Sequence, residues 1–152
     1  MRHQIILLAA VLSIIAGCMS NATAPSTTIS PREAVMLAAD AAPSGIPGTF
    51  EMDVVATGAQ NGMGFLNSQS DYRDQRNLTV AISPRLRTAM TEMLGEDPIL
   101  FYKGKRIVVR GQARRVTVFF FGKDGERTNK YYYQTHVQLQ APNDISLSTN
   151  EQ

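Results

Sequence analysis

Two long stretches of alternating apolar and polar residues constrain the fold of this 152-residue chain more than any other feature. Over 106–114, and again over 130–140, every second residue suits a buried face, and most of the residues between are polar or charged. Successive side chains of a strand point to opposite faces, so a period of two predicts two half-buried strands. Such strands must pair within a sheet, and the chain is therefore expected to be mainly β.

Earlier parts of the chain supply the remaining elements. Three shorter segments, separated by polar or glycine-containing turns, have the strand pattern: 49–57, 63–67 and 78–82. Ser83-Pro84 then begins a helix with apolar residues at helical spacing, which ends at Gly95. The expected order is strand, strand, strand, helix, strand, strand.

The apolar residues change parity after Arg115, which predicts a bulge or sharp bend with Gly111 as a nearby hinge. Phe119, Phe120 and Phe121 follow, just before a turn at 122–125. Consecutive strand residues cannot all face a core. One of the three rings therefore needs cover, from a helix over 34–39 or from a partner protein, and the three phenylalanines are candidate partner contacts.

The order of elements resembles that of the OB-fold, a five-stranded Greek-key barrel whose helix joins strands three and four. The segment FYKGKRIVVRG, at 101–111, is similar to the entry into strand four of many small exported bacterial OB-fold proteins. The resemblance covers 50–145. It implies a mainly β, five-stranded OB-like barrel over 49–147 with one helix between strands three and four, and a frayed tail at 148–152. An antiparallel sandwich, or a sheet with one packed helix, is the alternative.

The first eighteen residues are typical of an export signal. The apolar run over 5–16 would span about 18 Å as a helix, short of the ~30 Å hydrocarbon core of a bilayer. Ile15-Ala16-Gly17-Cys18 then resembles a bacterial lipobox. The resemblance implies that residues 1–17 are removed, that the Cys18 sulfur carries a diacylglycerol, and that its amino group carries an acyl chain such as palmitate. Two or more chains anchor a protein stably to a membrane. A plain secretory signal with an incidental Cys18 is the alternative.

Residues 18–48 are expected to hold the lipidated cysteine, a flexible tether and a short helix. Small polar residues fill 19–29, and Ser30, Pro31 and Glu33 form the start of a helix with a capping box. In enteric lipoproteins an aspartate after the cysteine retains the protein in the inner membrane. Met19 in that position predicts the outer membrane, with the domain facing the periplasm.

Positive charge is concentrated in one part of the chain, although the formal net charge is only +2. Nine lysines and arginines face two carboxylates over 103–130. Arg106, Arg110 and Arg114 project from one strand face at intervals of about 13 Å. Such a row, with a neighbouring ring such as Tyr132 for stacking, suits phosphate, sulfate or carboxylate groups of a polymer. The alternative is a solvated face, partly neutralised by Glu51 and Asp53 on the first strand.

The composition offers little for catalysis. One cysteine and two histidines cannot build an internal disulfide or a structural zinc site. Asp71 and Asp74 are three residues apart and are candidates for a cation site or acid–base pair. Alternatively they lock their own loop, with Asp71 capping a turn and an arginine bridging to Asp74. His136 is expected on a polar surface. We predict no catalytic residue, no metal and no cofactor.

The sequence therefore predicts a lipid-anchored envelope protein with a non-catalytic OB-like domain. Its expected role is binding or scaffolding through contact with another envelope protein. The alternative is a receptor for an anionic polymer (nucleic acid, lipopolysaccharide phosphate or acidic glycan) through the basic strand face.

Overall fold

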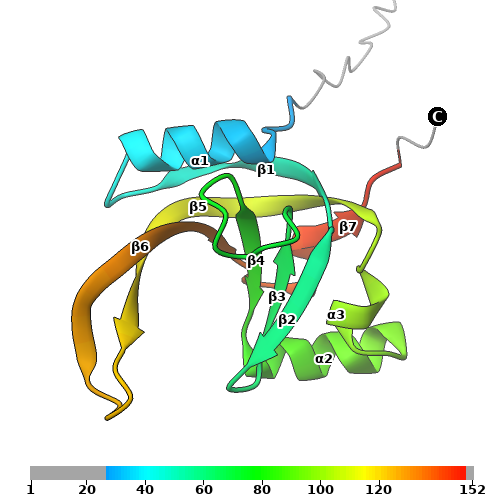
Figure 1. Ribbon diagram of the computed structural model, residues 1–152. Helices are drawn as coiled ribbons and strands as arrows, with labels where there is room; N and C mark the ends of the chain where they lie inside the picture. Colours follow the sequence, from blue (N-terminus) through cyan, green and yellow to red (C-terminus); the bar gives the residue numbers. More distant parts are fainter. Residues whose placement is uncertain (1–26, 150–152) are drawn as a thin grey trace, which may run out of the picture.

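The chain forms one strongly curved sheet flanked by short helices, and this computed structural model describes residues 27–149 (Figure 1). In chain order the elements are α1 (Pro31–Asp40), β1 (Ile46–Asp53), β2 (Ala56–Gln60), β3 (Met63–Asn67), β4 (Leu78–Ile82), α2 (Pro84–Leu94), α3 (Pro98–Phe101), β5 (Arg106–Phe121), β6 (Arg127–Gln138), a 3-10 turn η1 (Pro142–Asp144) and β7 (Ile145–Leu147). The prediction of a mainly β domain with a short N-terminal helix is confirmed. The predicted signal at 1–17 and Cys18 lie outside the described residues.

The strands pair in the order β1-β5-β6-β4-β3-β2, with β7 added beside β5. All neighbours are antiparallel except β4 and β6, which run parallel, so the sheet is mixed. The two end strands, β1 and β2, follow one another in the chain. Between them, the Val54 amide donates to Lys105 O (2.9 Å) and the Val55 amide to Asn67 O (2.9 Å). The chain thus changes from one partner strand to another within two residues.

The prediction of a barrel with five strands, and with one helix between strands three and four, is wrong in the number of strands and in the number of helices. The segment predicted as one strand over 49–57 is two strands, because its first half pairs with β5 and its second with β3. The C-terminal residues add β7, and α3 adds a second helix between β4 and β5. The hydrogen-bonded ladder also stays open, since β1 and β2 lie at its two ends.

Helix α1 lies along β1 and β5 (Figure 1). Its predicted capping box is present: the Glu33 amide donates to Ser30 Oγ (3.4 Å) and the Ser30 amide to Glu33 Oε2 (3.0 Å). Ala34 and Ala38 are fully buried on the face toward the sheet. Their small side chains allow the helix to approach the strands closely, so it covers one end of the core.

One cluster of buried apolar side chains fills the sheet's inner face. It draws on α1, α2 and every strand except β2. Its large, nearly inaccessible members are Phe50, Met52, Leu66, Leu78, Ile82, Met90 and Ile107. The cluster ends along β5 at Ala113 and along β6 at Val137, which are register partners.

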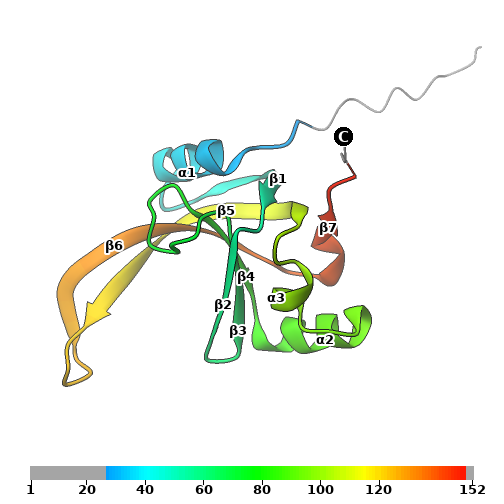
Figure 2. The same cartoon turned by 45° about the vertical axis from the view of Figure 1, so that its right-hand side comes forward.

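Beyond those two residues, β5 and β6 continue as a two-stranded projection. We call residues 114–136 the distal arm; it stands apart from the β2–β3 hairpin in both views (Figures 1 and 2). The register is unbroken from Ala113 to Phe119, and the irregularity lies between Phe119 and Phe121. The irregularity predicted after Arg115, a bulge or sharp bend, therefore lies nearer the turn than the change of parity indicated. The apolar residues of β5 switch from one face of the strand to the other because the buried core ends at Ala113. Beyond that residue, the next apolar side chains lie on the face opposite to the core.

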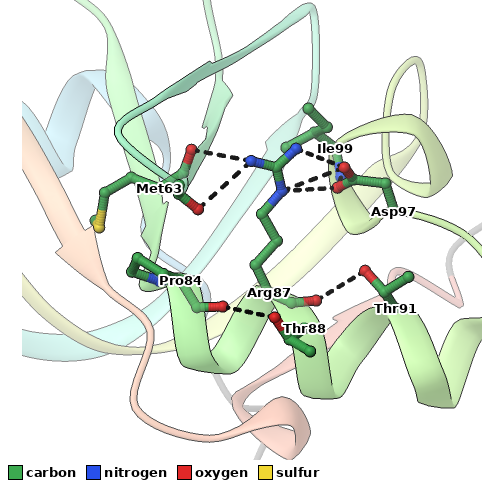
Figure 3. Close-up of polar contacts among 8 residues, drawn as sticks. Met63, Pro84, Arg87, Thr88, Thr91, Asp97 and Ile99 are labelled. Atoms are coloured by element: carbon green, nitrogen blue, oxygen red, sulfur yellow. Dashed lines mark hydrogen bonds and ion pairs between the residues drawn. The ribbon is translucent and has the colours of Figure 1, made fainter.

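Arg87 ties α2 to the start of α3 and to the β2–β3 turn (Figure 3). Its Nε donates to both carboxylate oxygens of Asp97 (3.1 and 3.2 Å), and its Nη1 donates to the carbonyls of Gly62 (3.4 Å) and Met63 (3.3 Å). The hydrogen bonds from Arg87 lower the pKa of Asp97, which also accepts from the Ile99 amide at 3.2 Å. These contacts fix the β2–β3 hairpin relative to the helices.

Candidate functional site

A cleft of about 750 Å³ opens between the β2–β3 hairpin and the distal arm. Figure 1 shows these two hairpins on either side of β4. We define the cleft by its lining residues, which are Ala56, Thr57, Gly58, Ala59, Gln60, Phe65, Asn67, Ser70, Tyr72, Arg73, Thr79, Val118, Phe119, Phe120, Phe121, Tyr132, Gln134 and His136. The first five are the whole of β2, so the cleft runs along one entire edge strand.

Buried amide and hydroxyl groups form the floor of the cleft. Asn67 and Thr79 are register partners on β3 and β4 and are only 5% and 2% exposed. Asn77 Nδ2 donates to Asn67 Oδ1 (3.0 Å) and to Thr79 Oγ1 (2.9 Å), and Thr79 Oγ1 donates to Asn67 Oδ1 (2.9 Å). Buried polar groups that satisfy one another in this way hold a fixed geometry. The floor is therefore a rigid polar surface.

His136 stands beside this floor, with its ring 6.3 Å from that of Phe65. Gln134 Nε2 donates to Tyr72 O (3.1 Å), which fixes the amide orientation and turns Gln134 Oε1 toward His136 Nε2 at 2.7 Å. An amide oxygen can only accept, so His136 Nε2 carries the proton. Burial lowers the pKa of His136 to about 4, and the ring is neutral at pH 7. His136 lies on the predicted polar face of its strand, but it is half-buried there.

Aromatic side chains form the rim. Tyr72, 47% exposed, comes from the loop before β4, and the Arg73 guanidinium lies 5.1 Å from its ring centre. From the distal arm, Phe120 and Tyr132 stand 5.4 Å apart, centre to centre. The rim thus offers several ring surfaces, and Arg73 is the one formally charged residue among the lining residues.

The predicted anion-binding arginines do not gather in the cleft. Arg106 pairs with Glu51 (3.2 Å) and Asp53 (3.4 Å), the internal pairing that the sequence left open as the alternative. Hydrogen bonds from Ser148 and Arg106 lower the pKa of Glu51. Arg110 donates to Asn143 O at 3.4 Å.

Arg114 borders a neighbouring hollow of about 440 Å³, and its Nε and Nη2 donate to Gln112 Oε1 (2.9 and 2.6 Å). Of the residues predicted to contact a ligand or partner, the structure brings together Tyr132, Phe119, Phe120 and Phe121, all of which line the cleft.

Sequence reasoning missed the floor of the cleft. In the sequence, Asn67 and Thr79 are polar residues at or within short predicted strands. Gln134 belongs to the predicted polar face of another strand. A signal was present: Thr79 stands between Leu78 and Val80 in a strand whose five residues are all buried. A polar side chain on the second face of such a strand needs partners, and those come from Asn67 and Asn77.

The loop over 70–76 is locked by its own carboxylates, as one of the two predictions had it. Asp71 Oδ1 accepts from the Arg73 amide (2.9 Å), and Asp74 pairs with Arg76 at 2.7 Å. The hydrogen bonds from Arg76 lower the pKa of Asp74 to about 2. Within residues 27–149 there is no group of three or more histidine, cysteine, aspartate or glutamate side chains placed to hold a metal ion.

Across residues 27–149, no helix has both the length and the apolar character needed to cross a membrane.

No protein-family description and no curated protein matches the chain. Solved structures similar to it include an example from each of two organisms. One is assigned as an aspartyl-tRNA synthetase of Leishmania major Friedlin, with 13% identity, a TM-score of 0.41, and 89% of this chain aligned to 23% of that one. The other is an aspartyl-tRNA synthetase of Entamoeba histolytica, with 10% identity, a TM-score of 0.45, and 96% aligned to 28%. This chain spans about a quarter of their length, and both likenesses are too remote to carry an argument about function.

Proposed function

We propose that this chain is a non-catalytic binding protein of the bacterial envelope, anchored to the outer membrane through lipid on Cys18. Its OB-like domain holds an extended segment of another envelope protein in the cleft. Three aspects support the proposal: the path of the strands, the position of the cleft, and the end strand that lines it.

The strand path supports an OB-like arrangement. If β1 and β2 are taken as two halves of one bent strand, it pairs with β3 through one half and with β5 through the other. The third strand, β4, then lies parallel to the last one, β6, and α2 joins β4 to β5. This is the five-strand connectivity with a helix between strands three and four that the sequence pattern favours.

The position of the cleft supports a binding role. OB-folds take their ligands on the face of strands two and three, between the loop joining strands one and two and the loop joining strands four and five. Here those parts are the outer face of β3 and β4, the β2–β3 hairpin and the distal arm. The cleft lies among these three parts.

The end strand that lines the cleft is the observation that carries the choice of ligand. β2 is the last strand of the ladder, so one side of its backbone has no strand partner, and all five of its residues line the cleft. A Cβ added at Gly58 would meet nothing within 4 Å, so the face of the strand at this position is open. An extended peptide can pair with such an edge while its side chains enter pockets beside it. The rings of Phe65, Phe120 and Tyr132 supply apolar surface for those side chains.

Charge favours a peptide over the alternative, an anionic polymer. Polyanion binding rests mainly on several cations that neutralise backbone charge. Arg73 is the one such cation among the lining residues, and Arg106 is already paired with Glu51 and Asp53.

Site-specific photo-crosslinking tests the cleft. In one variant of the full chain, expressed in its own bacterium, a photoreactive residue replaces Gln60, an exposed lining residue. In the control variant it replaces Met93, which is 63% exposed on α2 and lies outside the cleft. We expect a discrete adduct with an envelope protein from position 60 and none from position 93. Phe120→Ser should reduce that adduct at least fivefold without changing the amount of folded protein. Equal adducts from both positions, no adduct, or an adduct indifferent to Phe120→Ser overturns the proposal.

The anchor is tested separately. Mass spectrometry of the N-terminal peptide should find diacylglycerol on Cys18, and Cys18→Ser should move the protein out of the outer-membrane fraction. An unmodified cysteine in the mature protein contradicts the anchor and leaves the cleft proposal standing.

A further inference from the structure

One face of the distal arm carries a continuous row of rings and guanidinium groups. The row, which we call the tyrosine ladder, consists of Arg127, Phe119, Tyr131, Tyr133 and Arg115. The Arg127 guanidinium lies 4.5 Å from the Phe119 ring centre, and the Arg115 guanidinium lies 4.4 Å from that of Tyr133. Ring centres are 6.0 Å apart from Phe119 to Tyr131 and 5.5 Å apart from Tyr131 to Tyr133.

The tyrosine ladder faces away from the cleft. Strand neighbours alternate between faces. Val118, Tyr132 and Gln134 line the cleft, whereas Tyr131 and Tyr133, on either side of Tyr132, do not. Phe119 is the one member that also borders the cleft. The ladder is therefore a second surface on the same arm.

Two of the three rings of the ladder are exposed although they are largely apolar, and Phe119 is half-buried. Tyr131 is 52% and Tyr133 is 41% exposed, because the buried core of the domain ends at Ala113 and Val137. The arm projects from the body in both views (Figures 1 and 2). Contiguous exposed rings of this kind mark interaction surfaces.

We propose that the tyrosine ladder rests on the surface of an anionic lipid bilayer. Residues 114–136 hold five lysines and arginines against two carboxylates, a charge complementary to acidic lipid headgroups. Tyrosine has an apolar ring and a polar tip, and it concentrates at the level of the headgroups for that reason. The ladder combines both properties on one face, with a cation at each end.

The ring geometry favours a bilayer over single-stranded nucleic acid. Successive bases stack on ring faces that are free to receive them. Here the planes of neighbouring rings are tilted by 60° and 65°, and guanidinium groups of the chain itself already lie over Tyr133 and Phe119. What remains for a partner is ring edges, tyrosine hydroxyls and the outer N–H groups of two arginines, which suit phosphate headgroups and the layer just beneath them.

Vesicle binding tests the proposal with a chain that lacks the anchor. The whole buried core lies between residues 34 and 145, so a chain of residues 19–152 keeps it. This protein is sedimented with vesicles of phosphatidylcholine, with or without 30% phosphatidylglycerol. We expect binding to the anionic vesicles at least tenfold tighter than to the neutral ones. Arg115→Gln with Arg127→Gln should weaken it about tenfold, and Tyr131→Ser with Tyr133→Ser should weaken it severalfold, at high salt as well.

Matched variants elsewhere serve as controls. Arg85→Gln with Lys103→Gln removes the same charge from exposed positions outside the arm, and Tyr72→Ser removes an equally exposed ring from the cleft rim. Both should leave binding within threefold of the parent. Tyr131→Ser alone, at a half-exposed residue, keeps the test interpretable if the double variant is unstable.

The proposal is overturned by absent binding, by equal losses in control and ladder variants, or by dimerisation that the ladder variants abolish. Tighter binding of a single-stranded oligonucleotide through the same residues also overturns it. None of these results bears on the crosslinking from the cleft, so the two proposals fail independently.

Discussion

The immediate surroundings of His136 change how this domain responds to pH. The imidazole lies beside Phe65 and is hydrogen-bonded to Gln134, and burial lowers its pKa from the usual 6.5 to about 4. Between these two values the unfolded chain binds a proton that the folded chain does not. The free energy of unfolding therefore falls as pH drops from about 6.5 to about 4.

Replacing this histidine by an amide should remove that pH dependence. The glutamine of His136→Gln stays neutral at every pH. Urea unfolding at pH 7, 5 and 4 should therefore show that the free energy of unfolding of the variant, relative to that of the parent, rises by on the order of 2 kcal/mol as pH falls. Other titrating groups are common to both proteins and cancel in the difference. A constant difference from pH 7 to pH 4 would contradict an imidazole that stays neutral in the folded domain.

At the level of elements, close packing of two strands explains the glycine of β5. Gly111 was predicted to be a hinge, yet a Cβ at this position would lie 2.8 Å from Val137 Cγ1 on β6. Its backbone conformation is not in the left-handed region. The requirement is therefore space between β5 and β6, just before the distal arm leaves the core.

Gly111→Ala should destabilise the domain by about 1–3 kcal/mol, because the added methyl group overpacks a well-filled site. Gly58→Ala on β2 is the matched control: its methyl group meets nothing within 4 Å and should leave the free energy of unfolding nearly unchanged. Urea denaturation of both variants decides the matter. Equal stabilities would mean that Val137 moves aside without cost.

At the scale of the whole molecule, the last strand completes the single core. β7 pairs with β5 through three residues, and Ile145 is only 5% exposed within the main apolar cluster. Leu147, two residues later, is 43% exposed. A change near the C-terminus should therefore lower the stability of the entire domain, because one core unfolds as one unit.

Ile145→Ala should cost about 2–5 kcal/mol through lost burial and a residual cavity. Leu147→Ala should change the free energy of unfolding by less than about 0.5 kcal/mol. Circular dichroism and tyrosine fluorescence, followed through the same urea titration, should give coincident midpoints for each protein. Separate midpoints for Ile145→Ala would show that β7 belongs to a unit of its own.

Local patterns sufficed for most elements of the fold. The cap and proline at Ser30-Pro31 and at Ser83-Pro84 predicted where both main helices begin, and alternation placed β3 and β4 at their observed residues. These signals depend only on neighbours in the chain. The side chain of a cap residue accepts a hydrogen bond from the amide three residues ahead, and successive side chains of a strand point to opposite faces. The division of 49–57 into two strands could not be read in this way, because it arises from two different partners, β5 and β3.

The mainly β character, the helix starts and the self-locking loop of Asp71 and Asp74 all follow from interactions within a few residues. The candidate site, in contrast, depends on contacts between distant segments of the chain. The tertiary structure brought Asn67, Thr79 and His136 together from three strands, gave Arg106 its partners on β1, and separated Tyr131 from Tyr132 onto opposite surfaces of one arm. Burial and charge pairing depend on which strands meet across long separations in the chain, and a residue's own neighbourhood in the sequence does not contain that information.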